Sequence, residues 1–320
     1  NRNYPFRWGA LGEKGSRSRS TSVYYRGAKA ASEPEVKAMM KLANRERFAA
    51  SISYHTGTVA ILAPYTIPGV DNPPQNEAWA IAQEMVEVMP PHAQDRTFEL
   101  KKNLYPVDGT DQDWHRFAHG TVALLVEGAR RTPRRPHKRA KVLESVAPAW
   151  RFLLRRFTTG RLLDIHVSDT QGRGVNAEVV IEGMEPKAGE EWRTRCPSGR
   201  KLRALPNSGS WKLMVKRPGR PPVERVIAVE DGPVSVQVIL DDAESSELCP
   251  QGSRRERSVR PLANAALGAI HETAPGRRMP LLRTRDSPPQ PPHPDPGFPR
   301  PSRCRTTGAT DTRELCKAPS

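Results

Sequence analysis

Four positions in the first 130 residues carry side chains whose chemistry is complementary. Arg2, next to Asn1, offers a planar, permanently charged fork beside an amide donor, which together suit a carboxylate. His55 offers an imidazole nitrogen to a metal ion, and Glu127, at the end of an apolar stretch, could move a proton. Tyr105 lies 22 residues before Glu127. Each residue alone is a weak signal, because isolated examples usually serve packing or solvation.

The order of the surrounding motifs makes the signal stronger. Between and after these residues come several short motifs, in this order: Tyr25-Arg26-Gly27, Ser32-Glu33-Pro34-Glu35, Ser53-Tyr54-His55-Thr56-Gly57, Pro64-Tyr65 and Asp113-Trp114. The series resembles the zinc metallocarboxypeptidases of peptidase family M14, the carboxypeptidase A superfamily.

This resemblance implies a role for each residue. His55 would be the third zinc ligand, and Glu127 would be the general base that takes a proton from metal-bound water. Asn1 and Arg2 would bind the terminal carboxylate of the substrate, and Tyr105 would close over it. The implied activity is zinc-dependent removal of C-terminal residues from peptides or proteins.

The chain departs from the family pattern in its metal ligands. The family's other two ligands lie in an H-x-x-E segment upstream of Asn-Arg, and no such segment occurs in the 320 residues. Catalytic zinc needs about three protein donors. We therefore expect the chain alone to be inactive and the remaining ligands to lie upstream of residue 1. The alternative is a non-catalytic protein of the same fold that binds peptide C-termini.

Two further positions bear on the branch of the family. Relatives that prefer basic residues often carry Asp eleven positions after the zinc His, where this chain has Thr66. Gln112 resembles the carboxypeptidase N/E-like branch. That resemblance implies a secreted or periplasmic protein.

The net charge of +16 raises the question of a nucleic-acid partner. Much of the excess lies in one run of basic residues without interleaved aromatics for base stacking, between Arg130 and Lys141. We interpret this run as a solvated, flexible connection, so a nucleic-acid partner is not expected. No apolar run approaches the ~20 residues that span a bilayer.

Residues 1–129 show the alternating elements of an α/β domain, and the resemblance implies that they are the C-terminal part of the mixed-sheet carboxypeptidase domain. A helix is predicted from Ser32, which would cap it, with Glu35 completing a capping box and Pro34 in the first turn. A second helix is predicted over residues 76–89, and strands over 49–53, 58–62 and 121–126.

The pattern changes after residue 158. Residues 130–158 are predicted to hold the basic linker and a short helix from about Pro148, and residues 159–242 show the period-two alternation of a small antiparallel sandwich. The sandwich resembles the transthyretin-like domain that follows the catalytic domain in the N/E-like branch.

The last 78 residues contain 13 prolines but only one valine and one isoleucine, so residues 243–320 are predicted to be a disordered tail. A frameshifted reading near codon 243 is an alternative origin for this composition. The four cysteines have no zinc-ribbon or redox spacing, and His115, His119, His137 and His166 are interpreted as surface residues.

Overall fold

The computed structural model describes residues 2–91 and 97–250, all within one compact unit, Asn1–Arg260. After a short 3-10 turn at Gly12–Lys14, the helices and strands follow in this order: α1 Pro34–Glu46, β1 Ala50–His55, β2 Val59–Leu62, α2 Glu77–Val88, β3 Glu99–Lys101, α3 Asp111–His119, β4 Val122–Gly128, α4 Pro136–Thr159, β5 Leu162–Asp169, β6 Glu178–Ile181, β7 Arg200–Ala204, β8 Gly209–Lys216, β9 Val223–Val229 and β10 Pro233–Leu240.

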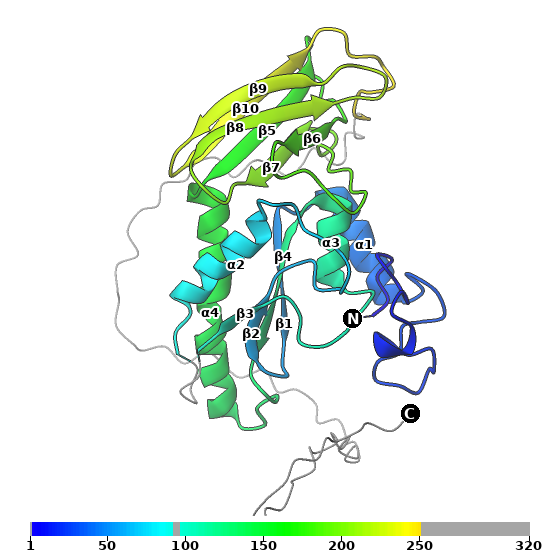
Figure 1. The fold of residues 1–320 in the computed structure, drawn as a ribbon, viewed down its shortest axis with the longest axis vertical. Helices are drawn as coiled ribbons and strands as arrows, with labels where there is room; N and C mark the ends of the chain where they lie inside the picture. The colour runs from blue at the N-terminus through cyan, green and yellow to red at the C-terminus, as the bar shows by residue number, and fades with distance from the viewer. Residues whose placement is uncertain (1, 92–96, 251–320) are drawn as a thin grey trace, which may run out of the picture. The chain divides into compact units, whose positions relative to one another are not determined.

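The first sheet is mixed, as predicted, and has the strand order β1-β4-β2-β3. β1 pairs with β4 in parallel, β2 pairs with β3 in parallel, and β2 pairs with β4 antiparallel. Figure 1 shows α2 and α4 on one side of this sheet and α1 and α3 on the other.

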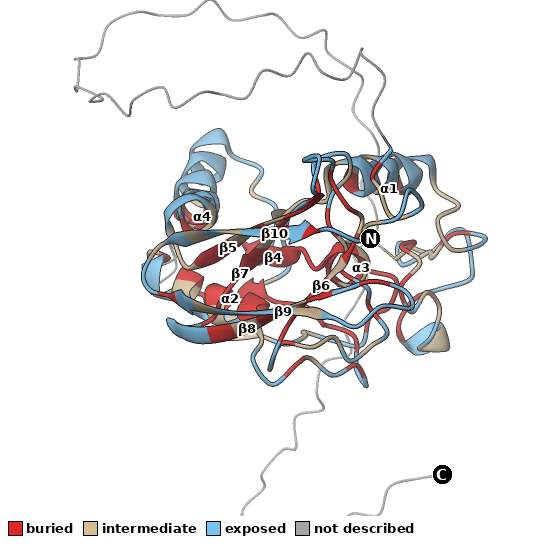
Figure 2. Ribbon diagram, turned by 90° about the horizontal axis from the view of Figure 1, so that it is seen from above, coloured by how far each residue is buried: buried red, intermediate tan, exposed pale blue. Residues whose placement is uncertain are grey.

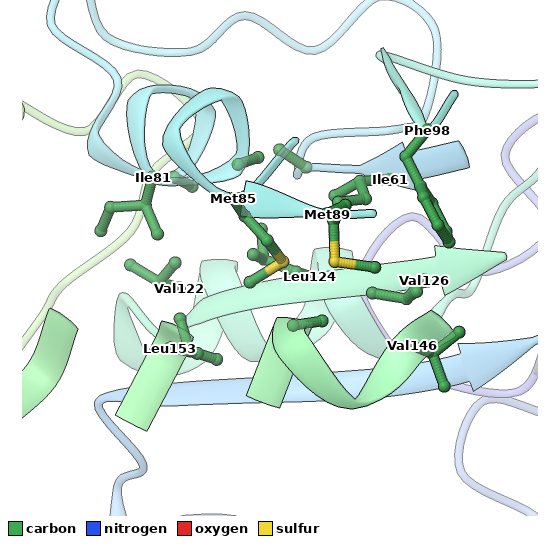
Figure 3. Close-up of a cluster of buried hydrophobic side chains, with 14 of the residues drawn as sticks. Ile61, Ile81, Met85, Met89, Phe98, Val122, Leu124, Val126, Val146 and Leu153 are labelled. Atoms are coloured by element: carbon green, nitrogen blue, oxygen red, sulfur yellow. The ribbon is translucent and has the colours of Figure 1, made fainter. Parts of the chain in front are cut away.

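All seven residues of β4 are buried, so this strand forms the centre of the first core. Val122, Leu124 and Val126 point to the face that packs under α2 and α4, where Met85 and Leu153 complete the cluster (Figure 3). This face follows from the period of two along a strand, because alternate side chains point the same way.

The start of α1 differs from the prediction. Ser32 does not cap the helix; the N-cap is Glu33, and its backbone N–H donates to the side chain of Asn3 at 3.0 Å. Ser32 Oγ instead donates to Glu33 Oε1 at 2.6 Å, while Pro34 occupies the first turn as expected. The N–H of the N-cap residue is thus satisfied by a residue 30 positions away.

α4 begins at Pro136, well before the predicted start near Pro148, and Pro148 lies inside it. The second half of the basic run is therefore helical and not a flexible connection. Val146, Ala149 and Leu153 form the buried stripe that holds α4 on the sheet. Figure 2 shows the opposite face of α4 exposed.

The second core is a two-layer sandwich of three-stranded sheets, β10-β5-β7 and β6-β8-β9. Most pairs are antiparallel as predicted, but β10 pairs with β5 in parallel over eight residues. One strand is little buried: Val226 on β9 is 74% exposed. β7 was not predicted, because Arg200-Lys201-Leu202-Arg203 lacks an apolar alternation.

The chain remains attached to the sandwich beyond the predicted boundary at residue 242. Cys249 forms a disulfide with Cys196, and its backbone N–H donates to Gly174 O at 2.8 Å. Residues 243–250 are thus part of the sandwich and not of a disordered tail. The rest of the predicted tail lies outside the described residues.

Two histidines predicted at the surface are buried. His115 and His119 lie on α3 with 4% and 7% exposure. His119 Nε2 lies 3.0 Å from Asn44 Oδ1. Polar residues dominate α3, so its sequence does not predict this burial.

Candidate functional site

The parallel pair β1 and β4 brings two of the predicted residues together. His55 is the last residue of β1, and its Cα partner across the ladder is Glu127 near the end of β4. The carboxyl ends of parallel strands meet at one edge of a sheet, so two residues 72 positions apart in sequence become neighbours.

Glu127 is buried, and its Oε2 atom has no hydrogen-bond partner among the described residues. Burial raises the pKa of the Glu127 carboxyl, and a hydrogen bond from the backbone of Thr58 partly opposes this shift. A Cβ atom on Gly57 would lie 3.4 Å from Oε2. The carboxyl is therefore poised to accept or release a proton nearer neutral pH than an exposed Glu.

Arg2 and Tyr105 are in direct contact. Arg2 Nη2 donates to Tyr105 Oη at 3.1 Å, and the guanidinium carbon lies 5.8 Å and 5.9 Å from the ring centroids of Tyr24 and Tyr105. Tyr105 is 51% exposed, as a side chain at the mouth of a pocket would be. The guanidinium is therefore held between two aromatic rings.

The N-terminal motifs hold Arg2 in place through its neighbour Asn3. Asn3 Nδ2 donates to Arg26 O at 2.7 Å, to Lys29 O at 2.8 Å and to Ser32 Oγ at 3.1 Å. Gly27 has a φ of +81°, and a Cβ there would lie 2.2 Å from Asn3 Nδ2. The Tyr25-Arg26-Gly27 and Ser32-Glu33 motifs thus form the cradle that fixes the segment carrying Arg2.

A second contact fixes the other side of this segment. Tyr4 N donates to Gly109 O at 2.9 Å. Gly109 has a φ of +62°, and a Cβ there would lie 2.3 Å from Arg2 O, so only glycine permits this approach.

The inner wall of the pocket is a hydrogen-bonded group on α3 and the segment after β2. Asp113 accepts from Thr66 N at 2.7 Å, from Thr66 Oγ1 at 3.0 Å and from Ile67 N at 3.0 Å. Gln112 Nε2 donates to Thr66 Oγ1 at 3.1 Å. Burial raises the pKa of Asp113 to about 6 against the effect of these bonds. Asp113-Trp114, one of the motifs of the series, therefore shapes the wall and has no direct chemical role in it.

His55 is half-buried, and burial lowers the pKa of its imidazole; the charge of Asp111 opposes this and the charge of Arg2 adds to it. The neutral imidazole is the form that binds a metal ion.

One pocket of about 40 Å³ contains most of the predicted residues. Arg2, His55, Tyr105 and Glu127 all line it. Thr66 and Gln112 lie in the same wall, while Asn1 is outside the described residues. Sequence reasoning missed Asn103, Leu104 and Thr110, which also line the pocket. Only their closeness in sequence to Tyr105 or Gln112 could have pointed to them.

The described residues do not by themselves fit a catalytic metal. The parts of the chain that the structure describes contain no group of three His, Cys, Asp or Glu that could hold a metal ion. His166 and Asp169, which have metal-like spacing, bond instead to Gln237 and Arg173. No helix in residues 2–91 and 97–250 is long and apolar enough to cross a membrane.

Comparison with known proteins gives a family match for part of the chain. Residues 1–134 match the family model of the zinc carboxypeptidases, peptidase family M14. This match confirms the coarse resemblance predicted from the order of the motifs. No curated protein matches the chain.

Two solved structures are similar to part of the chain. Bovine thrombin-activatable fibrinolysis inhibitor, in complex with tick carboxypeptidase inhibitor, is 26% identical over 48% of this chain and 56% of that one, with a TM-score of 0.39. A second structure of thrombin-activatable fibrinolysis inhibitor is 24% identical over 48% of this chain and 41% of that one, with a TM-score of 0.40. The chain thus spans about half the length of these proteins.

Proposed function

We propose that residues 2–127 form the carboxylate-binding part of a zinc-dependent metallocarboxypeptidase site. The observation that carries this proposal is the convergence of Arg2, His55, Tyr105 and Glu127 on one pocket. Arg2, with Asn1, would bind the terminal carboxylate of a peptide or protein. Glu127 would act as general base, and His55 would be a zinc ligand.

Zinc, when bound, would supply an activated water and a polarised carbonyl. Among the described residues we assign only His55 as a ligand of this kind, and the family resemblance implies two further ligands in an H-x-x-E segment. We therefore expect the 320-residue polypeptide alone to have no peptidase activity.

The contact between Arg2 and Tyr105 indicates how a ligand would enter. The pocket is small, about 40 Å³, and the Tyr105 hydroxyl occupies one donor of Arg2. A bound carboxylate would replace that hydroxyl, because a charged acceptor forms a stronger bond with a guanidinium than a neutral one does. Tyr105 would then be released to cover the ligand.

The assignment to the N/E-like branch, with a transthyretin-like sandwich as a stabilising or docking module, belongs to the same proposal. Gln112 in the pocket wall and a sandwich directly after the α/β part support it. Secretion or export to a periplasm is supported by the Cys196–Cys249 disulfide, since such bonds persist in oxidising compartments.

The first test is binding of a short peptide in two forms, with a free C-terminal carboxylate and with a C-terminal amide. We expect the carboxylate form to bind more tightly and Arg2→Ala to weaken its binding by about 10- to 100-fold, the equivalent of a charge-assisted hydrogen bond of about 1.5–3 kcal/mol. Arg19→Ala, on an exposed loop, is the matched control and should leave the affinity unchanged. Equal binding of the two peptides would rule out carboxylate recognition.

The second test concerns catalysis. A form that also carries an H-x-x-E segment should release C-terminal residues in a chelator-sensitive reaction, and Glu127→Gln should abolish this release without loss of peptide binding. If such a form bound peptide and zinc but never cleaved, the alternative of a non-catalytic peptide C-terminus-binding protein would be correct. Chelator-sensitive release by the 320-residue chain alone would contradict the ligand argument.

A further inference from the structure

A basic cavity of about 460 Å³ lies between the end of α1 and the edge of the sandwich at β7. This volume is within the range of roughly 300–1,000 Å³ that small-molecule sites occupy. Its charged lining residues are Glu46, Arg47, Arg195, Arg200 and Lys201, and it shares no lining residue with the pocket around Arg2. Four cationic side chains therefore face one carboxylate.

Two of the four cations have acidic partners. Arg195 Nη2 lies 2.9 Å from Glu46 Oε2, and Arg200 Nε donates to Asp164 Oδ1 at 3.0 Å. The side chains of Arg195 and Arg200 remain about half exposed. These ion pairs orient the two guanidinium groups at the rim of the cavity, and part of each guanidinium remains exposed to solvent there.

The other two cations have only carbonyl partners among the described residues. Arg47 Nη1 donates to Arg193 O at 3.1 Å and to Thr194 O at 2.8 Å, and Lys201 Nζ donates to His119 O. No carboxylate of the described residues forms an ion pair with either group. Lys201 is 7% exposed, and burial lowers the pKa of its ammonium well below the usual value. A buried cation without an anionic partner is costly.

The fold does offer one partial counter-charge. His119 is the last residue of α3, so Lys201 lies at a helix C-terminus, which carries about half an elementary negative charge. This partial charge explains why the Lys201 side chain points to the end of α3, but it does not also compensate the charge of Arg47.

The backbone at Arg47 supports a role beyond ending α1. Arg47 has a φ of +47°, a conformation that residues other than glycine rarely adopt and that commonly occurs at functional sites. Glycine would end the helix more easily there. The guanidinium of Arg47, which reaches the sandwich and lines the cavity, is what glycine could not supply.

We propose that this cavity binds a tetrahedral oxyanion, a phosphate or sulfate group, between Arg47, Arg200 and Lys201. The oxygens of such an anion match the fork of a guanidinium, and its charge would compensate the half-buried Arg47 and the buried Lys201. This binding goes beyond the proposed peptidase function and does not depend on it.

The test is isothermal titration calorimetry of the 320-residue chain with inorganic sulfate and with inorganic phosphate, at low ionic strength. We expect saturable binding of one anion per chain. Arg200→Gln, at an exposed side chain, and Lys201→Met, which keeps the buried volume, should each weaken binding about tenfold. Lys216→Met, on an exposed position of β8, is the matched control and should bind like the unchanged chain.

The source of the anion is identified by a parallel titration with a sulfated tetrasaccharide. Tighter binding of the saccharide than of inorganic sulfate would identify a sulfated sugar as the ligand, and equal or weaker binding would identify the free ion; both results support the site. The proposal is overturned if no saturable binding is detected, or if both variants bind like the control while circular dichroism shows that they are folded.

Discussion

His119 illustrates how one buried side chain links stability to pH. Burial lowers its pKa from 6.5 to about 4, and the charges of Lys201, Arg47 and His115 act in the same direction. The unfolded chain therefore binds more protons than the folded chain between these two pKa values. The stability associated with neutral His119 is complete above pH 6.5 and is lost as the pH falls toward 4.

We predict that the advantage of the unchanged chain over His119→Gln decreases by up to about 3 kcal/mol between pH 7 and pH 4. The free energy of unfolding in urea, measured for both proteins across this range, tests the prediction. Asp113, whose raised pKa of about 6 favours the folded state on acidification, is common to both proteins and cancels in the difference. Parallel pH profiles would contradict the prediction.

The candidate site shows which residues a sequence can reveal. The order of the short motifs along the chain was enough to predict four site residues, and the fold brings all four to one pocket: Arg2, His55, Tyr105 and Glu127. The hydrogen bonds of Asn3 could not be predicted, since they depend on carbonyls at Arg26 and Lys29 whose directions only the folded loop determines.

At the level of elements, the bounds of a helix could be predicted where its apolar residues recur regularly and could not where they do not. α2 was predicted within a residue of each end because its apolar spacing is regular, and in the structure Asn76 caps it. α4 was predicted too short, because its first six residues are exposed and show no apolar repeat. When packing against a sheet stabilises a helix, its first turns can form without a local sequence signal that predicts them.

The Cys196–Cys249 disulfide gives a prediction for the end of the sandwich. The two cysteines are 53 residues apart, and closing a loop of this length stabilises the folded state by about 4 kcal/mol on chain-entropy grounds. Cys249→Ser should therefore lower the melting temperature and expose residues 243–248 to proteases. Limited proteolysis and thermal unfolding measure both effects.

Cys304→Ser and Cys316→Ser are the controls for this prediction, and both should melt like the unchanged chain. Alkylation of Cys249 in the folded, unreduced protein would show that the disulfide is absent.

At the level of the whole molecule, one aromatic ring joins the two cores. Trp192 is fully buried, and the guanidinium carbons of Arg116 on α3 and Arg203 on β7 lie 4.4 Å and 4.5 Å from its ring centroid. Both arginines also bond Glu77 of α2, and Trp192 Nε1 donates to Arg116 O at 3.0 Å. The sandwich is therefore integral to the support of α3, which carries Gln112 in the pocket wall.

We predict that Trp192→Ala destabilises the protein by about 3–5 kcal/mol and separates the unfolding of the two cores into two transitions. Trp150→Ala, at a half-exposed position of α4, is the matched control and should change stability by less than about 0.5 kcal/mol. Urea unfolding followed by circular dichroism distinguishes them. A similar, small effect of both substitutions would contradict a coupling role for Trp192.

The disulfide closes a covalent ring between residues 196 and 249, which determines how a backbone cut within the sandwich would appear in electrophoresis. It encloses β7, β8, β9 and β10, including the exposed basic turn around Arg220. A single cut in the backbone of that turn would leave the two pieces joined by one bond. The nicked molecule would migrate as a single intact chain under oxidising electrophoresis and divide into two only after a thiol is added.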